Sequence, residues 1–342
     1  MTAGVANIGI LGAGSIGAYL GGRLTAAGVT TVLVARQPLV DAVARDGLRL
    51  TSLDGFDRTL PASSVHIVTN PLVLASCDFI LVTVKGHDTV HVARQLPTIL
   101  RHDAIVVSFQ NGVGNAEILH RALGDHAVLP GMVPFNVLRR GEAHFHQGTS
   151  GVLAIQALPD GRHAPLVEAL ERAGLPAHAY DDLRGIQWGK LLVNLNNSIN
   201  ALSGLPLQQQ LAQRPYRKVM AACVREGLRV LKRAGIKPQI DAPLPPSLVP
   251  ALMELPNGIF KMLSKKIVDI DPNARSSMWE DLQRGRKTEV DLLNGEIVRL
   301  GAQLDVPTPI NQRIVDLVKE AEHRGAPPSL AAGELQKLVL HP

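Results

Sequence analysis

A lysine followed by a row of amides is the part of this sequence best suited to chemistry. In the segment WGKLLVNLNNSIN, read as a helix, Asn194 and Asn197 lie within roughly 40° of Lys190. Ser198 and Asn200 flank that face by roughly 80° on opposite sides. A partly buried lysine beside a hydride donor can protonate the alkoxide that forms from a ketone and stabilise its charge. The alternative is an amide network that only ties the helix to its neighbours.

A glycine-rich turn near the N-terminus predicts a dinucleotide-binding site. The run GILGAGSIG carries the pattern GxGxxG between an apolar strand over 7–11 and a helix over 18–27. The three glycines would permit the sharp turn, the approach of a pyrophosphate and close packing of the helix, whose N-terminus attracts anions. A turn that uses glycine for packing alone is the alternative. The residues predicted to bind the cofactor here are Gly12, Ala13, Gly14, Ser15, Ile16 and Gly17.

The residue after the second strand, which is expected over 31–35, indicates the form of the cofactor. Sites that prefer NAD usually place an acid there to hold the ribose hydroxyls. This chain has Arg36 instead, and arginine can grip a 2′-phosphate through two charge-assisted hydrogen bonds. The sequence therefore predicts NADPH/NADP+ rather than NADH, with a solvated surface arginine as the alternative.

Two further strand ends and a carboxylate in the second half of the chain supply the remaining candidates. Ligands of open α/β sheets bind where strands end, and Lys85 and Asn111 lie at two such ends. Lys85 could reach the cofactor, and Asn111 the nicotinamide ribose or a substrate; a surface lysine and an Asn-Gly turn are the alternatives. Glu289, next to Arg286 and Lys287, could accept a substrate hydroxyl or belong to a salt-bridged helix face.

The elements that must position these residues change in kind near residue 182. Before it, apolar runs over 80–84, 104–109 and 127–133 alternate with helical segments, and strands over 144–146, 151–156 and 177–180 are expected as hairpin-like additions. After it, strand signals nearly vanish, and apolar residues from about 279 to 300 recur at helical spacing. The predicted fold is an α/β Rossmann-type dinucleotide-binding domain over 1–182, followed by an all-α C-terminal substrate domain over 183–342.

Composition limits the classes of protein that fit. A chain of 342 residues with 46% hydrophobic residues can build two substantial cores. Its two cysteines lie in apolar surroundings, which is typical of core residues in a reducing compartment. The sequence shows no signal peptide and no apolar run long enough to span a membrane, so we expect a cytoplasmic protein without membrane partners. The net charge of +5 is dispersed, which does not call for nucleic acid, and no metal-ligand spacing occurs. A homodimer is a possible assembly.

Taken in order, the motifs resemble the ketopantoate reductase (2-dehydropantoate 2-reductase) family over almost the whole chain. The resemblance is carried by the glycine turn and by residues 83–85, 110–112, 188–190, Asn194, 276–278, 287–291 and 294–295. It implies a Rossmann domain, a helical domain and a cleft between them, in which NADPH reduces 2-dehydropantoate to pantoate for pantothenate biosynthesis.

The resemblance also implies roles for single residues. Lys190 would be the proton donor, and Arg36 would bind the 2′-phosphate. Asn111 would meet cofactor and substrate, and Glu289 the cofactor or the substrate hydroxyl. The remaining implied contacts are the cofactor ribose for Lys85 and the substrate for Asn194 and Ser277, with Ser198 and Asn200 as further substrate candidates.

The sequence departs from the family pattern in the expected substrate region. The family usually has an asparagine where Ser198 stands, and the phrase Ile-Asn-Ala-Leu, which contains Asn200, comes two residues later. Either serine has replaced the amide, or the helix carries a two-residue insertion as a bulge. Residues 208–211 also replace an Asn-Gly-Glu-Leu phrase. A paralogous reductase of another 2-oxo acid, a β-hydroxyacid or glycerol-3-phosphate-type dehydrogenase, and a non-catalytic NADPH-sensing protein are therefore alternatives.

Overall fold

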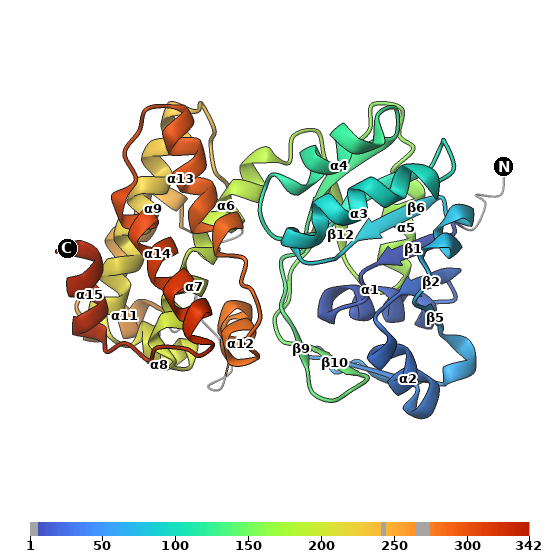
Figure 1. Cartoon of the computed structure of the whole chain (residues 1–342), viewed down its shortest axis with the longest axis horizontal. Helices are drawn as coiled ribbons and strands as arrows, with labels where there is room; N and C mark the ends of the chain where they lie inside the picture. The colour runs from blue at the N-terminus through green and yellow to red at the C-terminus, as the bar shows by residue number, and fades with distance from the viewer. Residues whose placement is uncertain (1–5, 241–243, 265–273, 342) are drawn as a thin grey trace. The chain divides into compact units, whose positions relative to one another are not determined.

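The computed structural model describes residues 6–240, 244–264 and 274–341. The chain forms two compact units, Met1–Leu183 and Arg184–Pro342. In the described residues the strands all belong to the first unit, and the second unit is built from helices (Figure 1).

The first unit is built on an eight-stranded sheet in the order β12-β11-β8-β7-β6-β1-β2-β5. From β5 to β8 all neighbouring strands are parallel, in the 3-2-1-4-5-6 order of dinucleotide-binding folds. This confirms the predicted Rossmann-type domain. The strands are β1 (Ile8–Leu11), β2 (Thr31–Val34), β5 (His66–Val68), β6 (Phe79–Val82), β7 (Ile105–Ser108), β8 (Ala127–Met132), β11 (Leu153–Gln156) and β12 (Ala177–Tyr180).

The prediction of hairpin-like additions after β8 is confirmed for residues 137–147, which form an antiparallel hairpin, and is wrong for the last strand. β11 runs antiparallel to β8, but β12 runs parallel to β11, because α5 (Ala164–Arg172) returns the chain to the same end of the sheet. β10 (His144–Gln147) joins a second, four-stranded sheet in the order β4-β3-β10-β9. Its other strands, β3 (Leu48–Ser52), β4 (Asp57–Leu60) and β9 (Val137–Arg139), were not predicted, and neither was β5.

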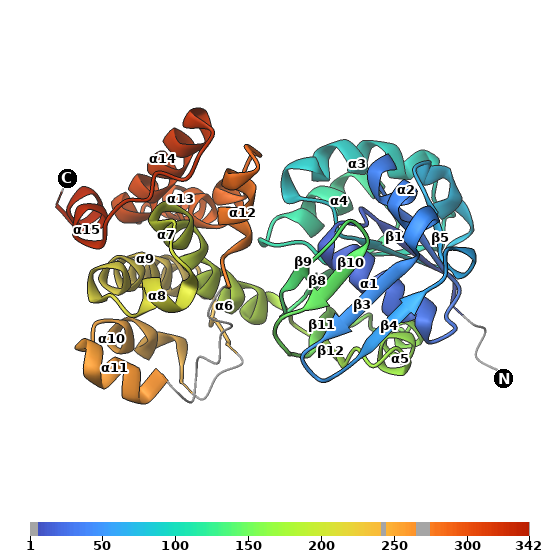
Figure 2. The same cartoon turned by 90° about the horizontal axis from the view of Figure 1, so that it is seen from below.

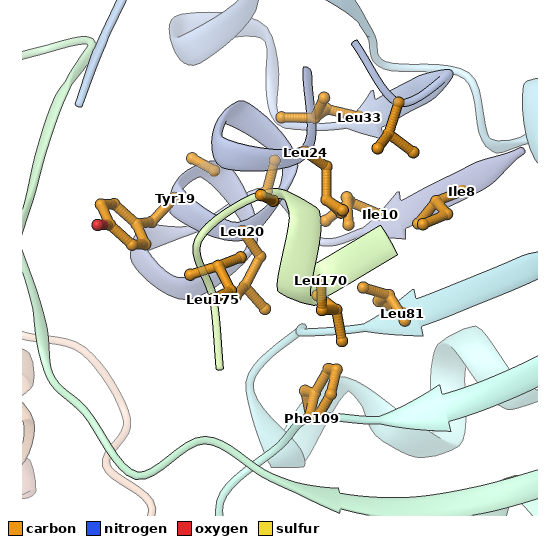
Figure 3. Packing of buried hydrophobic residues seen from close by; sticks show 14 of the residues in the cluster. Ile8, Ile10, Tyr19, Leu20, Leu24, Leu33, Leu81, Phe109, Leu170 and Leu175 are labelled. Carbon is orange, nitrogen blue, oxygen red and sulfur yellow. The ribbon is translucent and has the colours of Figure 1, made fainter. Parts of the chain in front are cut away.

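Helices cover both faces of the large sheet, which explains its nearly continuous apolar strands. The side chains of each strand alternate between the two faces. The first face packs against α1 (Ser15–Ala26), α2 (Gln37–Asp46) and α5, and the second against α3 (Thr89–Gln95) and α4 (Asn115–Leu123). Figure 3 shows the first face, with Leu20, Leu24 and Leu170 of the helices against Ile8, Ile10, Leu33, Leu81 and Phe109. The strands' carboxyl ends are thereby held at one edge.

The second unit packs around α9 (Arg214–Arg233), which is its longest helix in the described residues (Figure 2). α9 contacts helices that come both before and after it in the sequence, so the early and late parts of this unit share one core. The other helices are α6 (Arg184–Asn194), α7 (Asn196–Ser203), α8 (Leu207–Leu211), α10 (Val249–Met253), α11 (Asn257–Ser264), α12 (Ser277–Gln283), α13 (Asn294–Gln303), α14 (Pro309–Arg324) and α15 (Ala332–Leu340).

A fully buried cation, Arg217, fastens α9 to the α10–α11 region. Its guanidinium donates hydrogen bonds to the carbonyls of Leu211, Met253 and Leu255 at 2.7, 3.0 and 2.7 Å. The same group stacks over Phe260, 4.1 Å from the ring centroid. Arginine offers enough donors to satisfy several carbonyls at once, so one side chain caps two short helices that would be marginal alone.

Two segments predicted as continuous helices are interrupted. The amide-rich helix breaks at Leu195, where Asn196 forms a reciprocal pair of amide hydrogen bonds with Gln210 of α8. The expected helix over 279–300 ends at Gln283, because Gly285 takes a left-handed φ of 59°. A 3₁₀ turn, Val290–Leu292, then leads into α13, so the helical prediction for 284–293 is wrong.

No helix in the described part of the chain has the length and apolarity needed to cross a membrane.

Candidate functional site

In the glycine turn after β1, packing requires glycine at the first and third positions, and the second position faces open space. Gly12 has φ 97°, and a Cβ there would lie 2.7 Å from the backbone nitrogen of Val84. A Cβ on Gly17 would lie 2.4 Å from the hydroxyl of Thr83, which donates a hydrogen bond to the Gly12 carbonyl at 2.9 Å. A Cβ on Gly14 would meet nothing closer than 3.9 Å. The turn is thus rigid on the sheet side and accessible at Gly14.

The N-terminus of α1 has the properties of an anion site. The helix begins at Ser15, its first turn carries no acidic residue, and no described side chain caps it. Its first N–H groups and the positive end of its dipole therefore point out of the turn that contains Ala13 and Gly14. A pyrophosphate is the ligand that such a turn accommodates.

Arg36 lies just after β2 and extends into solvent. It occupies the N-cap position of α2, and 85% of its side chain is exposed. The carboxylate of Asp88 lies 3.6 Å from its guanidinium. At this exposure such an ion pair contributes little, so the guanidinium is accessible to a phosphate.

Gln110 braces the chain beside Lys85. Its side-chain amide donates hydrogen bonds to the Val84 carbonyl at 3.1 Å and to the Thr89 hydroxyl at 2.7 Å. Its oxygen accepts a hydrogen bond from Ser108 at 3.0 Å. Because Val84 directly precedes Lys85, this buried amide fixes the end of β6 against the end of β7.

The same network continues to Asn111. Thr89 donates to Asn115 at 2.8 Å, and Asn115 donates to the Asn111 carbonyl at 2.7 Å. Thr89 and Asn115 are buried supports that were not predicted from the sequence. Their only signal was that they are polar residues close to the two strand ends. The structure thus places Lys85 and Asn111 on neighbouring strand ends joined by one polar network.

Lys190 lies on α6 at a place where the helix approaches another backbone segment very closely. A Cβ on Gly189 would lie only 1.7 Å from the carbonyl oxygen of Gln239. The Gln239 N–H donates to the Gly185 carbonyl at 2.9 Å, so the segment lies along α6 over a full turn. Gly189 is therefore needed for packing, and it fixes the position of the neighbouring lysine.

Lys190 is electrostatically coupled to Glu289. Burial lowers the pKa of Lys190 to about 8, and the negative charge of Glu289 acts in the opposite direction. Glu289 is 6% exposed and lies in the turn before the 3₁₀ segment, not on a helix face. The structure therefore brings together the two residues predicted as catalytic, from segments about 100 positions apart in the chain.

The residues predicted to bind substrate fall into two groups, of which the first is at least partly accessible. Asn194 is half-buried on α6, and Ser277 is exposed at the start of α12. Ser276, the N-cap of α12, donates its backbone N–H to Asn200 at 2.9 Å and its hydroxyl to the Asn197 carbonyl at 3.1 Å. These contacts hold the start of α12, and with it Ser277, against α7.

The second group, Ser198 and Asn200, is fully buried and has structural partners. Ser198 donates to Asn294 at 2.5 Å, and Asn200 donates to the Leu205 carbonyl at 2.9 Å while accepting from Ser276. Gln210, at another departure from the family pattern, is also fully buried. We therefore leave Ser198 and Asn200 out of the substrate site proposed below.

Both units match models of one family. Residues 8–160 match the model described as "Ketopantoate reductase PanE/ApbA", and residues 182–322 match its C-terminal counterpart. A relative from Archaeoglobus fulgidus, named 2-dehydropantoate 2-reductase, is 30% identical over 93% of this chain and 98% of its own. The chain belongs to the ketopantoate reductase family.

Other members of the family support the same assignment. A 2-dehydropantoate 2-reductase from Halobacterium salinarum is 27% identical over 92% of this chain and 99% of its own length. The crystal structure of a family member from Ralstonia eutropha matches with a TM-score of 0.79 and 31% identity, over 93% of this chain and 99% of that one. The described residues of both units thus have the fold of this family.

The close packing at Gly189 gives a stability prediction. We expect Gly189→Ala to lower the free energy of unfolding by about 1–3 kcal/mol, because α6 or the Gln239 segment must move to admit the methyl group. Gly258→Ala is the matched control, since Gly258 also lies in a helix and a Cβ there meets nothing within 4 Å. Urea unfolding followed by circular dichroism measures both. Equal stability of the two variants would contradict the close approach.

Proposed function

We propose that this chain catalyses the NADPH-dependent reduction of 2-dehydropantoate to pantoate, in pantothenate biosynthesis. The observation that carries the proposal is the half-buried Lys190, with a pKa of about 8, coupled to the buried Glu289. A lysine with a pKa near neutral pH can give up a proton during turnover and recover it from water. Membership of the ketopantoate reductase family supplies the reaction in which such a lysine is used.

The first unit would hold the cofactor, a nicotinamide dinucleotide. The open side of Gly14 and the N-terminus of α1 suit its pyrophosphate. Arg36 would bind the 2′-phosphate of NADPH, while Lys85 and Asn111 would contact its sugar at the strand ends. When bound, the reduced nicotinamide supplies a hydride.

Lys190 would complete the reduction with a proton. As the hydride adds to the ketone carbon of the substrate, the Lys190 Nζ donates a proton to the ketone oxygen, so that an alcohol forms and the lysine is left neutral. Before the transfer, the ammonium group stabilises the negative charge developing on that oxygen. Glu289 keeps the lysine protonated at neutral pH and could accept a hydrogen bond from the substrate hydroxyl.

The substrate would be bound by Asn194 and Ser277, with Asn111 meeting both substrate and cofactor. For the reduction, the hydride from the cofactor and the proton from Lys190 must reach the same carbonyl group. The departures from the family pattern at Ser198 and Gln210 lie at fully buried positions, which favours the family substrate over another 2-oxo acid. A cytoplasmic location remains part of this proposal.

The function is tested by following NADPH oxidation with 2-dehydropantoate and a panel of other 2-oxo acids. We expect turnover with 2-dehydropantoate, and a loss of about 1,000-fold in kcat for Lys190→Ala, because the proton donor is removed. NADPH binding, measured by its fluorescence, should stay within about threefold of wild type, since Lys190 is assigned to proton transfer. Turnover of a different 2-oxo acid instead of 2-dehydropantoate would contradict the proposed substrate. Full activity of Lys190→Ala would contradict the mechanism.

The preference for NADPH is tested at Arg36. Replacing it with aspartate removes the cation and adds a charge that repels the 2′-phosphate. We expect Arg36→Asp to lower the ratio of kcat/KM for NADPH to that for NADH by about 100-fold, or about 2.7 kcal/mol. Arg45→Asp, at the other end of α2, is the control and should leave the ratio unchanged. An unchanged ratio in Arg36→Asp would show that Arg36 is a solvated surface residue that does not bind the 2′-phosphate.

A further inference from the structure

Glu289 is carried by a short segment with little regular structure of its own. We call residues 288–294 the Glu289 segment. Inside it, the backbone N–H of Leu292 donates to the Glu289 carbonyl at 3.0 Å, and that of Leu293 donates to the Val290 carbonyl at 3.2 Å. A 3₁₀ turn of three residues is too short to be stable alone. Its position therefore depends on contacts from elsewhere in the unit.

Three of those contacts come from α14, which meets the Glu289 segment in an antiparallel register. One contact is made to a backbone N–H, one is an ion pair, and one joins two buried amides. The pairs are Thr288 N–H to Glu322 Oε1 at 2.7 Å, Asp291 Oδ1 to Lys319 Nζ at 2.7 Å, and Asn294 Nδ2 to Asn311 Oδ1 at 3.0 Å.

The contact made by Glu322 is the one closest to Glu289. It accepts the N–H of Thr288, a residue that is 3% exposed, and a carboxylate makes this a charge-assisted hydrogen bond. The Thr288 hydroxyl in turn accepts the N–H of Val290 at 3.2 Å. The residues on both sides of Glu289 are therefore fixed, and Glu322 holds the first of them.

α14 is itself a firm support. The buried carboxylate of Glu226 on α9 accepts the N–H groups of Ile310 and Asn311 at 3.0 and 2.9 Å, which caps the first turn of α14. It also accepts the Asn311 side-chain amide at 2.8 Å. The helix that holds the Glu289 segment is thus anchored to the central helix of the unit.

We propose that Glu322 is a positioning residue for the proton-transfer step, acting through Thr288 to hold the Glu289 carboxylate at Lys190. This inference rests on the proposed function of Lys190 and Glu289. Glu322 touches neither substrate nor cofactor in this scheme. Its carboxylate fixes a backbone N–H, so its role requires an acceptor oxygen at this place, and the negative charge only strengthens the hydrogen bond.

Three variants of α14 test this inference. Glu322→Leu removes the acceptor, and Glu322→Gln keeps an acceptor oxygen of similar reach without the charge. Glu320→Leu is the matched control, because Glu320 belongs to the same helix but pairs with Arg313 and Arg324 instead of the Glu289 segment. If Glu322→Leu does not fold, Glu322→Ser removes the contact with a smaller polar side chain.

The expected readout is a loss of kcat without a loss of cofactor binding. Glu322→Leu should lower kcat for NADPH oxidation about 10- to 100-fold, since small displacements of catalytic groups cost that much. Glu322→Gln should recover kcat to within about threefold of wild type, because it restores the acceptor. NADPH binding should stay within about twofold in all three variants. Unchanged kcat in Glu322→Leu, or an equal loss in Glu322→Gln or Glu320→Leu, would overturn the inference.

A double-variant cycle shows whether Glu322 acts through Glu289. In a Glu289→Gln background, adding Glu322→Leu should change the residual kcat by less than about twofold, because the carboxylate that it positions is already absent. A full, additive loss would overturn the inference. The proposed function fails separately, if the wild-type protein does not oxidise NADPH with 2-dehydropantoate. The roles of Lys190 and Glu289 fail if Lys190→Ala and Glu289→Gln both keep wild-type kcat.

Discussion

The balance of burial and charge at Lys190 is the constraint on which this account depends. Burial alone would drive the ammonium group toward its neutral form, and the negative charge of Glu289 limits that effect, leaving a pKa of about 8. A freely exposed lysine would hold its proton too firmly to donate it well near neutral pH, and a fully buried one without an acid would lack the proton. Both the position of α6 and that of the Glu289 segment must therefore be fixed.

Much of the second unit is arranged to fix them. The backbone near Gln239 packs so closely against Gly189 that there is no room for a methyl group, and this contact fixes the position of α6. Buried polar contacts through Asn294 and Asn311 connect α7, α13 and α14. In the first unit a comparable network through Gln110 joins two strand ends. In both units, buried hydrogen bonds hold the backbone next to the functional side chains.

Sequence patterns predicted the Rossmann-type sheet and the helical second half, because buried strands and the glycine turn leave strong local signals. The sequence and the family resemblance singled out Lys190 and Glu289 separately, but their coupling was not predicted, since no local pattern relates residues so far apart. Spacing placed Ser198 and Asn200 beside the lysine face, but both are fully buried, because helical angles cannot tell an accessible face from one buried against a neighbour. It also extended a helix across Gly285, where apolar residues at helical intervals belong to separate elements. Glu322 gave no signal at all, because its partner is a backbone N–H.

The central claim is tested most directly by titrating Lys190 itself. Selective isotope labelling of lysine and NMR would follow its side-chain resonance with pH in the wild type and in Glu289→Gln. We expect a pKa of about 8 in the wild type and a lower pKa in Glu289→Gln, where burial acts without the opposing charge. A wild-type pKa near the ordinary lysine value of 10.5, or one that Glu289→Gln leaves unchanged, would contradict it.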